Sequence, residues 1–262
     1  MRVLVAQILT CSFLLHAETN LERGKRVVNE AVAGLGGERF LQMETREESG
    51  RAVSLYREQI NGLSVATIYT RYASGVADTA HNLAVREREN FGKKQDYGVL
   101  FSEREAFDIT FRGARPLPDD QVARYKETTL HNVFYILRIR LKEPGMIFES
   151  RGADVLQNVP VEIVDITDGD NRTTTVYFDQ INKWPIRQVF IRRDPQTKLT
   201  NEEVTIFSKY RTVDGISWPC AIQRQRDGEM IYEIFSDSIS FNKQTPPGLF
   251  DLPSGIKRLK PE

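Results

Sequence analysis

Apolar and polar residues alternate along most of the chain from about residue 44 onward, as they do in half-buried β-strands. Residues 51–60 and 63–72 alternate in this way and flank Asn61-Gly62, a strong signal for a tight β-hairpin turn. Further segments with strand character are 82–91, 97–103, 106–112, 160–167, 172–179, 184–193, 201–210, 216–225 and 229–241. Because charged residues lie between the apolar ones, we expect an antiparallel sheet with one face in water.

Two segments have helical periodicity instead. The first spans about residues 20–35, where Thr19 and Glu22 have the capping-box spacing and Gly36-Gly37 end the helix. The second runs from about residue 119 to 141 and ends at Pro144-Gly145. Its apolar stripe consists of Val122, Tyr125, Leu130, Val133, Phe134, Leu137 and Leu141. We expect this central helix to pack against the concave face of the sheet.

These elements predict an α+β fold: a large curved antiparallel sheet, forming an unclosed β-barrel, wrapped around the central helix and preceded by the N-terminal helix. About ten or eleven strands are expected, and a sheet of that size curls strongly. No shift in composition separates the strands on either side of the central helix. Residues 18–262 are therefore interpreted as a single domain.

Residues 1–17 differ from the rest of the chain. Arg2 precedes an apolar stretch over residues 3–15, and Ala17 is followed by a polar sequence. This pattern is typical of a secretory signal peptide, and the stretch is shorter than the about 20 apolar residues that span a bilayer. We expect cleavage after Ala17 and a periplasmic or otherwise exported protein. A buried N-terminal element and lipidation of Cys11 are the alternatives.

Composition mainly excludes functions. The 262 residues include 36 Lys and Arg against 36 Asp and Glu, a formal charge of zero that argues against a nucleic-acid partner. Cys11 and Cys220 are the only cysteines and His16, His81 and His131 the only histidines, which leaves little material for a metal centre or a histidine-dependent triad. Nucleophile elbow, P-loop, zincin and dinucleotide motifs do not occur. We therefore predict a protein that is not an enzyme and uses no cofactor or metal; an enzyme with a dispersed site is the alternative.

Aromatic and aliphatic side chains are the chain's main resource for binding. In the strand 201–210 we expect Val204 and Ile206 to face inward, because Glu203 and Lys209 lie on the other face. The candidate cavity-lining residues are Val133, Phe134, Leu137, Tyr177, Phe190, Ile206 and Trp218. A packed core built from the same residues is the alternative, and the pattern alone leaves both open. Cys220 follows Trp218 in an apolar segment, so we expect it to be buried.

A series of short motifs in the second half resembles a known family. They are 176–179 (VYFD), 183–185 (KWP), 210–219 (YRTVDGISWP), 239–242 (ISFN) and 250–253 (FDLP). Together with the Leu-Gly-Gly end of the first helix, this order is similar to that of the LolA/LolB-like outer-membrane lipoprotein-sorting superfamily and its uncharacterised bacterial relatives. The resemblance covers about residues 20–255 and is strongest over 172–253.

The resemblance implies an unclosed antiparallel β-barrel around helices, with a hydrophobic cavity that binds lipoprotein acyl chains or other lipids. We accordingly expect an exported binding or carrier protein whose partner is a lipid or lipoprotein acyl chain, with a cell-envelope protein as a further partner. The main alternative is a structural or interaction module of the cell envelope that has a filled core and no ligand.

Overall fold

The computed structural model describes residues 17–57, 59–76, 78–79, 81–102, 105–194 and 197–261. The expected signal peptide over 1–17 lies outside the described residues except for Ala17, and Cys11 lies outside them as well. Within the described ranges, no helix combines the length and the apolar character needed to cross a membrane.

Thirteen strands of the described residues form one antiparallel sheet. In chain order they are β1 (Thr45–Tyr56), β2 (Gln59–Tyr72), β3 (Val85–Phe91), β4 (Tyr97–Phe101), β5 (Ala106–Thr110), β6 (Gly113–Pro116), β7 (Ile147–Leu156), β8 (Val159–Thr167), β9 (Thr173–Asp179), β10 (Pro185–Arg193), β11 (Thr200–Val213), β12 (Ile216–Arg226) and β13 (Glu229–Phe241). Their spatial order is β6-β5-β4-β3-β2-β1-β13-β12-β11-β10-β9-β8-β7. The edge strands β6 and β7 stand at opposite ends of this order, so the sheet is the expected unclosed one.

One sheet includes both halves of the chain because β13 returns to pair with β1. The register runs from Arg46 opposite Phe241 to Ser54 opposite Tyr232. Strands β6 and β7 are the two that the sequence pattern did not place. β6 has four residues, begins with a glycine and ends with Pro116, which suits only an edge position.

The hairpin predicted at Asn61-Gly62 forms, but its turn lies elsewhere. Pairing between β1 and β2 continues to Tyr56 and Gln59, so the turn falls between these two residues. Ser54 pairs with Gly62 and the register then shifts, which places Asn61 in a β-bulge. The Asn-Gly signal therefore marks an irregularity inside β2.

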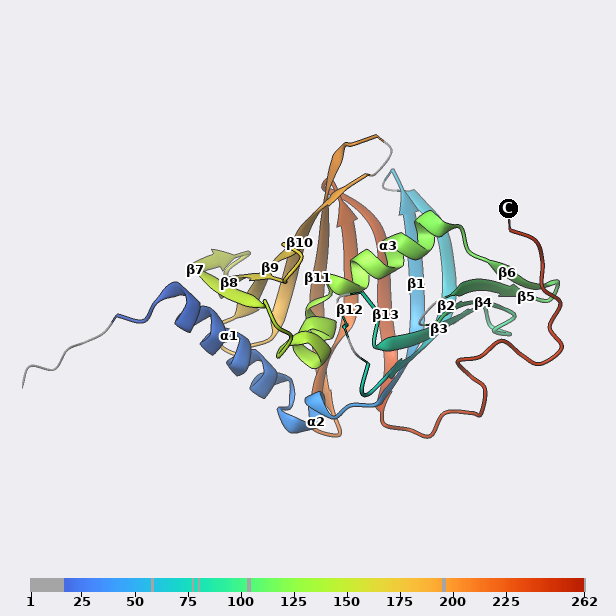
Figure 1. The fold of residues 1–262 in the computed structure, drawn as a ribbon, viewed down its shortest axis with the longest axis horizontal. Coiled ribbons are helices and arrows are strands. Elements are labelled where there is room, and N and C mark those ends of the chain that lie inside the picture. Colours follow the sequence, from blue (N-terminus) through green and yellow to red (C-terminus); the bar gives the residue numbers. More distant parts are fainter. Residues whose placement is uncertain are drawn as a thin grey trace, which may run out of the picture.

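Helix α1 (Asn20–Leu35) forms as predicted. Thr19 and Glu22 complete the capping box, and Gly36 ends the helix with a φ of 125°. The helix lies along β7 and β8 (Figure 1), close enough that a Cβ on Gly24 would stand 2.3 Å from the carbonyl oxygen of Phe148. A short helix, α2 (Glu38–Leu41), leads from α1 into the sheet.

The single helix predicted over 119–141 is interrupted. It divides into α3 (Asp119–Leu130), α4 (Val133–Tyr135) and the π-helix η1 (Ile136–Arg140). The cause is Asn132, whose side chain accepts hydrogen bonds from the backbone N–H groups of Phe134 and Tyr135 and so starts a new helix. Helix α3 crosses the concave side of the sheet in front of β11, β12, β13 and β1 (Figure 1).

The main core lies where α1, α4 and η1 meet the inner face of the sheet. It includes Leu35, Val133, Leu137, Phe178 and Trp218, all of them buried. A second, smaller cluster lies under the C-terminal segment and consists of Leu100, Phe107, Ile109 and Ala114, with Leu252 and Ile256 packed against it. Cys220 is a free, buried thiol, as expected.

The charged side chain of Arg140, at the end of η1, is buried in the interior. Its side chain is 1% exposed. Its Nη2 lies 2.8 Å from Asp168 and its Nε 2.6 Å from Glu143. Its Nη1 donates to the carbonyl of Leu130 at 3.2 Å. These contacts tie η1 both to the end of α3 and to the turn between β8 and β9.

Candidate functional site

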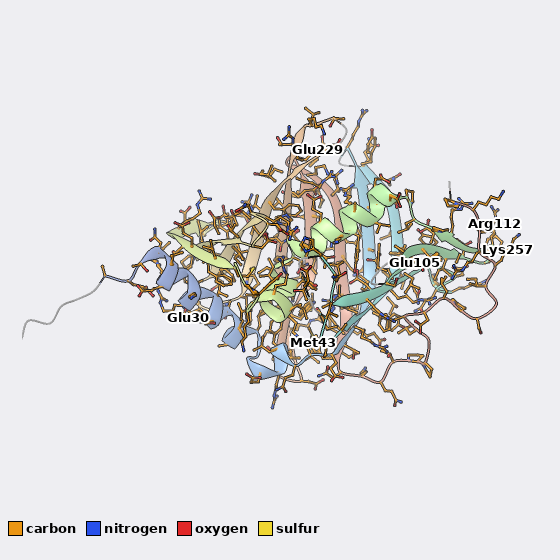
Figure 2. The ribbon with its side chains drawn as sticks, in the orientation of Figure 1. Glu30, Met43, Glu105, Arg112, Glu229 and Lys257 are labelled. Atoms are coloured by element: carbon orange, nitrogen blue, oxygen red, sulfur yellow. The ribbon has the colours of Figure 1, made fainter. Side chains whose placement is uncertain are left out.

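A cavity of about 600 Å³ lies between the concave face of the sheet and helix α3. Side chains of β1 to β4 form one side, side chains of β10 to β13 form the other, and α3 and α4 cover it. Met43 and Glu229 mark opposite ends of the strands that form the cavity (Figure 2). Sites for small molecules typically measure about 300–1,000 Å³.

One part of the wall is aromatic and aliphatic. Phe134 of α4 meets Phe207 of β11 edge-on, with ring centroids 5.0 Å apart, and its centroid lies 4.4 Å from that of Trp218 on β12. Ile222 and Ile234 extend this surface along β12 and β13. The wall therefore offers a hydrocarbon chain a place away from water.

Five of the seven predicted cavity residues lie on the inner side of the sheet or in the core, and only two of these five line the cavity. Phe134 and Trp218 line the cavity. Val133, Leu137 and Phe190 are buried elsewhere in the interior. The apolar face of 130–137 thus mostly fills the core, and only part of it is available to a ligand.

The other two residues, Tyr177 and Ile206, lie on the outer face. Arg187 of β10 is paired with Tyr177 on β9 and with Ile206 on β11, so the three side chains share one face of the sheet. The Arg187 guanidinium lies 5.4 Å from the Tyr177 ring centroid. The inward choice for 201–210 is therefore corrected: Thr205 and Phe207 line the cavity, and Ile206 points away from it.

The reason for this correction is that the inner face carries charge. Glu203 shares the inner face with Thr205 and lies 3.2 Å from Arg192 and 3.0 Å from Arg226. Arg124 of α3 approaches it to 3.6 Å. Because these guanidiniums compensate the carboxylate, a charged position on β11 does not mark the solvent face.

A second part of the cavity wall is polar, with a buried ion pair at its base. Glu48, 2% exposed, lies 2.8 Å from the Nε of Arg46. Glu48 also accepts hydrogen bonds from the indole Nε1 of Trp218 at 3.1 Å and from the hydroxyl of Ser236 at 2.7 Å. The Arg46 guanidinium stands 4.4 Å from the Trp218 ring centroid. The Glu48 carboxylate is therefore well compensated, whereas the Arg46 Nε makes no hydrogen bond to any described residue.

Two further carboxyls, Glu87 and Glu89, line the cavity from β3. Glu87 accepts a hydrogen bond from Thr70 at 3.2 Å and lies 3.9 Å from Arg46. Burial raises the pKa of Glu87. Burial, followed by the charge of Glu87, raises the pKa of Glu89 to about 8. The protonated form of Glu89 is thus favoured over a wider pH range than for an exposed glutamate.

Aromatic rings border these two carboxyls. Phe101 pairs with Glu87 across β3 and β4 and stacks on Tyr125 of α3, with centroids 3.7 Å apart. Tyr232 lines the cavity from β13, and the exposed Arg224 guanidinium lies 5.7 Å from its ring centroid. The polar end therefore combines two carboxyls, aromatic faces and one cation at its rim.

Sequence reasoning missed this polar wall. Glu87 and Glu89 alternate in 85–91 (VRERENF), so they share one face of β3, but charged residues on a strand ordinarily indicate the face in water. The alternation predicts that Glu87 and Glu89 lie next to each other on one face of the strand. It could not show that their face is the concave one.

Among the residues that the structure describes, no group of three or more His, Cys, Asp or Glu side chains is arranged to hold a metal ion. The buried His131 instead stacks on Phe190, with centroids 4.1 Å apart, and its Nδ1 lies 2.8 Å from the hydroxyl of Thr174.

Solved structures with a similar architecture cover nearly the whole chain. A DUF1329 family protein from Desulfovibrio piger superposes with a TM-score of 0.59 at 11% identity, over 89% of this chain and 98% of that one. A putative outer membrane lipoprotein-sorting protein domain from Vibrio parahaemolyticus gives 0.58 at 8% identity, over 88% and 97%. A LolA superfamily protein from Nitrosomonas europaea gives 0.51 at 8% identity, over 87% and 96%. The fold is LolA-like.

The sequence matches no protein-family model and no curated protein. At identities of 8 to 11%, the likeness to solved structures carries the LolA-like fold and not the ligand. The ligand must be inferred from the residues around the cavity.

Proposed function

We propose that this LolA-like protein is an exported, non-enzymatic binding or carrier protein that holds a lipid or a lipoprotein acyl chain in the cavity under α3. Residues 18–262 would form a single lipid-binding domain. One protein with the same fold is a putative outer membrane lipoprotein-sorting protein domain. The pattern of residues 1–17 supports export to the periplasm, where a cell-envelope protein would deliver or receive the lipid.

The observation that carries the proposal is the apolar part of the cavity wall, formed by Phe134, Phe207 and Trp218. Each methylene that leaves water for such a surface gains about 0.8 kcal/mol. A chain of about ten methylenes therefore gains about 8 kcal/mol, before the cost of ordering it is subtracted. The polar end of the same cavity favours a ligand with a polar group over a plain hydrocarbon.

Helix α3 is suited to admit such a ligand. Of its twelve residues only Leu130 is fully buried, and α3 carries several polar side chains over the cavity. The chain breaks directly after it, at Asn132, where α4 begins. A rotation of α3 about this break would open the cavity without disturbing the buried α4 and η1.

The test compares neighbouring positions of β11 that face opposite ways. Phe207→Ala removes part of the cavity wall, whereas Ile206→Ala is the matched control on the outer face. Binding of a neutral fluorescent apolar dye would be measured for both, with circular dichroism to verify folding. We expect Phe207→Ala to weaken binding about tenfold, corresponding to about 1.4 kcal/mol, and Ile206→Ala to leave it unchanged. Equal binding by the two variants, or none by the wild type, would favour an envelope module without a ligand.

A further inference from the structure

The charges around the polar end of the cavity do not balance. Arg46 and Glu48 compensate each other at 2.8 Å. Glu87 accepts a hydrogen bond from Thr70, lies 3.9 Å from Arg46 and is close enough to Arg224 to feel its charge, but forms no closer ion pair among the described residues. Among the described residues, no cation stands within ion-pair distance of Glu89, although Arg224 is close enough to act on its charge. The pair Glu87 and Glu89 therefore adds negative charge that the protein compensates incompletely.

Protonation is how the protein relieves this charge. Burial and the neighbouring Glu87 together raise the pKa of Glu89 to about 8, so the acid form persists at neutral pH. A ligand that brings its own positive charge would replace this proton and leave both carboxyls ionised.

The aromatic rings next to the carboxyls favour the same kind of group. Tyr125 and Phe101 stack beside Glu87, and Tyr232 lines the cavity from the opposite side. Aromatic faces attract an ammonium group through the ring quadrupole, and this attraction grows as the group is desolvated. A site with carboxyls at one position and rings around them offers an ammonium both a charge partner and an apolar surface.

We propose that the polar end of the cavity binds the ammonium group of an amphipathic ligand whose hydrocarbon chain lies against Phe134, Phe207 and Trp218, a step that rests on the proposed function. An anionic head group is the opposite choice. The cavity is also lined by Arg46 and Arg124, but these already face Glu48 at 2.8 Å and Glu203 at 3.6 Å. The least engaged cation would be Arg224, which is exposed at the rim, and the anion would stand in the field of Glu87 and Glu89. The geometry thus favours the cation.

The test uses three single-chain probes below their micelle concentrations: dodecyltrimethylammonium, dodecanoate and the neutral dodecyl maltoside. Each displaces a neutral fluorescent apolar dye from the full chain. We expect the ammonium probe to displace the dye at a concentration about tenfold lower than dodecanoate. We also expect its affinity to rise between pH 6 and pH 9, because binding releases the proton of Glu89.

Two variants locate the effect. Glu89→Gln removes the charge and nearly keeps the shape, and it should reduce the preference for the ammonium probe to within about twofold. Glu229→Gln, at an exposed strand end (Figure 2), is the control and should keep the preference. Dodecanoate binding more tightly, or an unchanged preference in Glu89→Gln, would overturn the inference. If all three probes bind equally, the acyl-binding function stands and the ammonium site fails; if none binds, the proposed function itself fails.

Discussion

The indole Nε1 of Trp218 donates a hydrogen bond of 3.1 Å to the carboxylate of Glu48, 170 positions earlier in the chain. The bond joins β12 to β1 across β13, at the base of the cavity. One face of the same ring contacts the apolar wall through Phe134, and the Arg46 guanidinium lies over the ring as well. Trp218 is therefore the point at which the apolar and the charged parts of the cavity wall meet.

Replacement of Trp218 should show how much its hydrogen bond to the Glu48 carboxylate contributes to stability. Trp218→Phe keeps an aromatic ring but removes the donor to Glu48, which is only 2% exposed. We expect a loss of about 1–3 kcal/mol in the free energy of unfolding, measured by urea denaturation. A loss below about 0.5 kcal/mol would mean that Ser236 and Arg46 suffice to hold the carboxylate.

Removal of Arg140 should be more damaging. Arg140→Met fills similar space but removes the 2.6 Å partner of Glu143 and the buried one of the two guanidiniums on Asp168, which keeps only Arg172. We expect a destabilisation of about 3–5 kcal/mol, the usual cost of breaking a buried pair from one side. Arg26→Met breaks exposed ion pairs on α1 and is the control, with an expected loss below about 1 kcal/mol. Similar losses in both variants would show that burial does not set the strength of the Arg140 contacts.

His131 should make the protein sensitive to acid. Burial lowers the pKa of His131 to about 4, against 6.5 for an exposed histidine, and Asp168 offsets only part of this effect. In this pH range His131 binds a proton in the unfolded chain but not in the native state. The free energy of unfolding therefore falls as the pH is lowered from about 6.5 to about 4. His131 alone should contribute about 1.4 kcal/mol per pH unit in this window. Denaturation of His131→Asn at several pH values should give a shallower dependence; an unchanged slope would contradict a neutral, buried His131.

Glu89 should show the opposite dependence. Because burial raises its pKa to about 8, the native state holds a proton that the unfolded chain releases near pH 4.5. The contribution of Glu89 to stability therefore falls as the pH rises from about 4.5 through about 8. Glu89→Gln should raise the melting temperature at pH 9 and have little effect at pH 4, with Glu229→Gln unchanged throughout. A lower melting temperature for Glu89→Gln at pH 9 would show that the ionised carboxylate is well compensated.

Local signals in the sequence were enough to predict the first helix and all the strands except β6 and β7. Alternation in 229–241 gave the bounds of β13, and Thr19 with Glu22 marked the start of α1. Both patterns depend on residues a few positions apart, which is the range over which backbone hydrogen bonding and side-chain periodicity act.

The site could be predicted only in part because its chemistry depends on contacts between distant residues. Phe134 and Trp218 were found because large aromatic residues are rare and tend to be buried. Glu203 was assigned to the outer face, since only the folded sheet shows that Arg192 stands beside it. The break after α3 was missed for a similar reason: the apolar stripe continues through Asn132, and the cap outweighs it.

The presence of a bound amphiphile in the native protein tests the account most directly. The full chain would be purified without detergent from the envelope fraction of its own cells, and its bound lipids extracted and identified by mass spectrometry. We predict close to one acyl-chain lipid per protein in the wild type and much less in Phe207→Ala, with Ile206→Ala like the wild type. Wild-type protein that carries no lipid and displaces no apolar dye would contradict the central claim that this cavity binds an acyl chain.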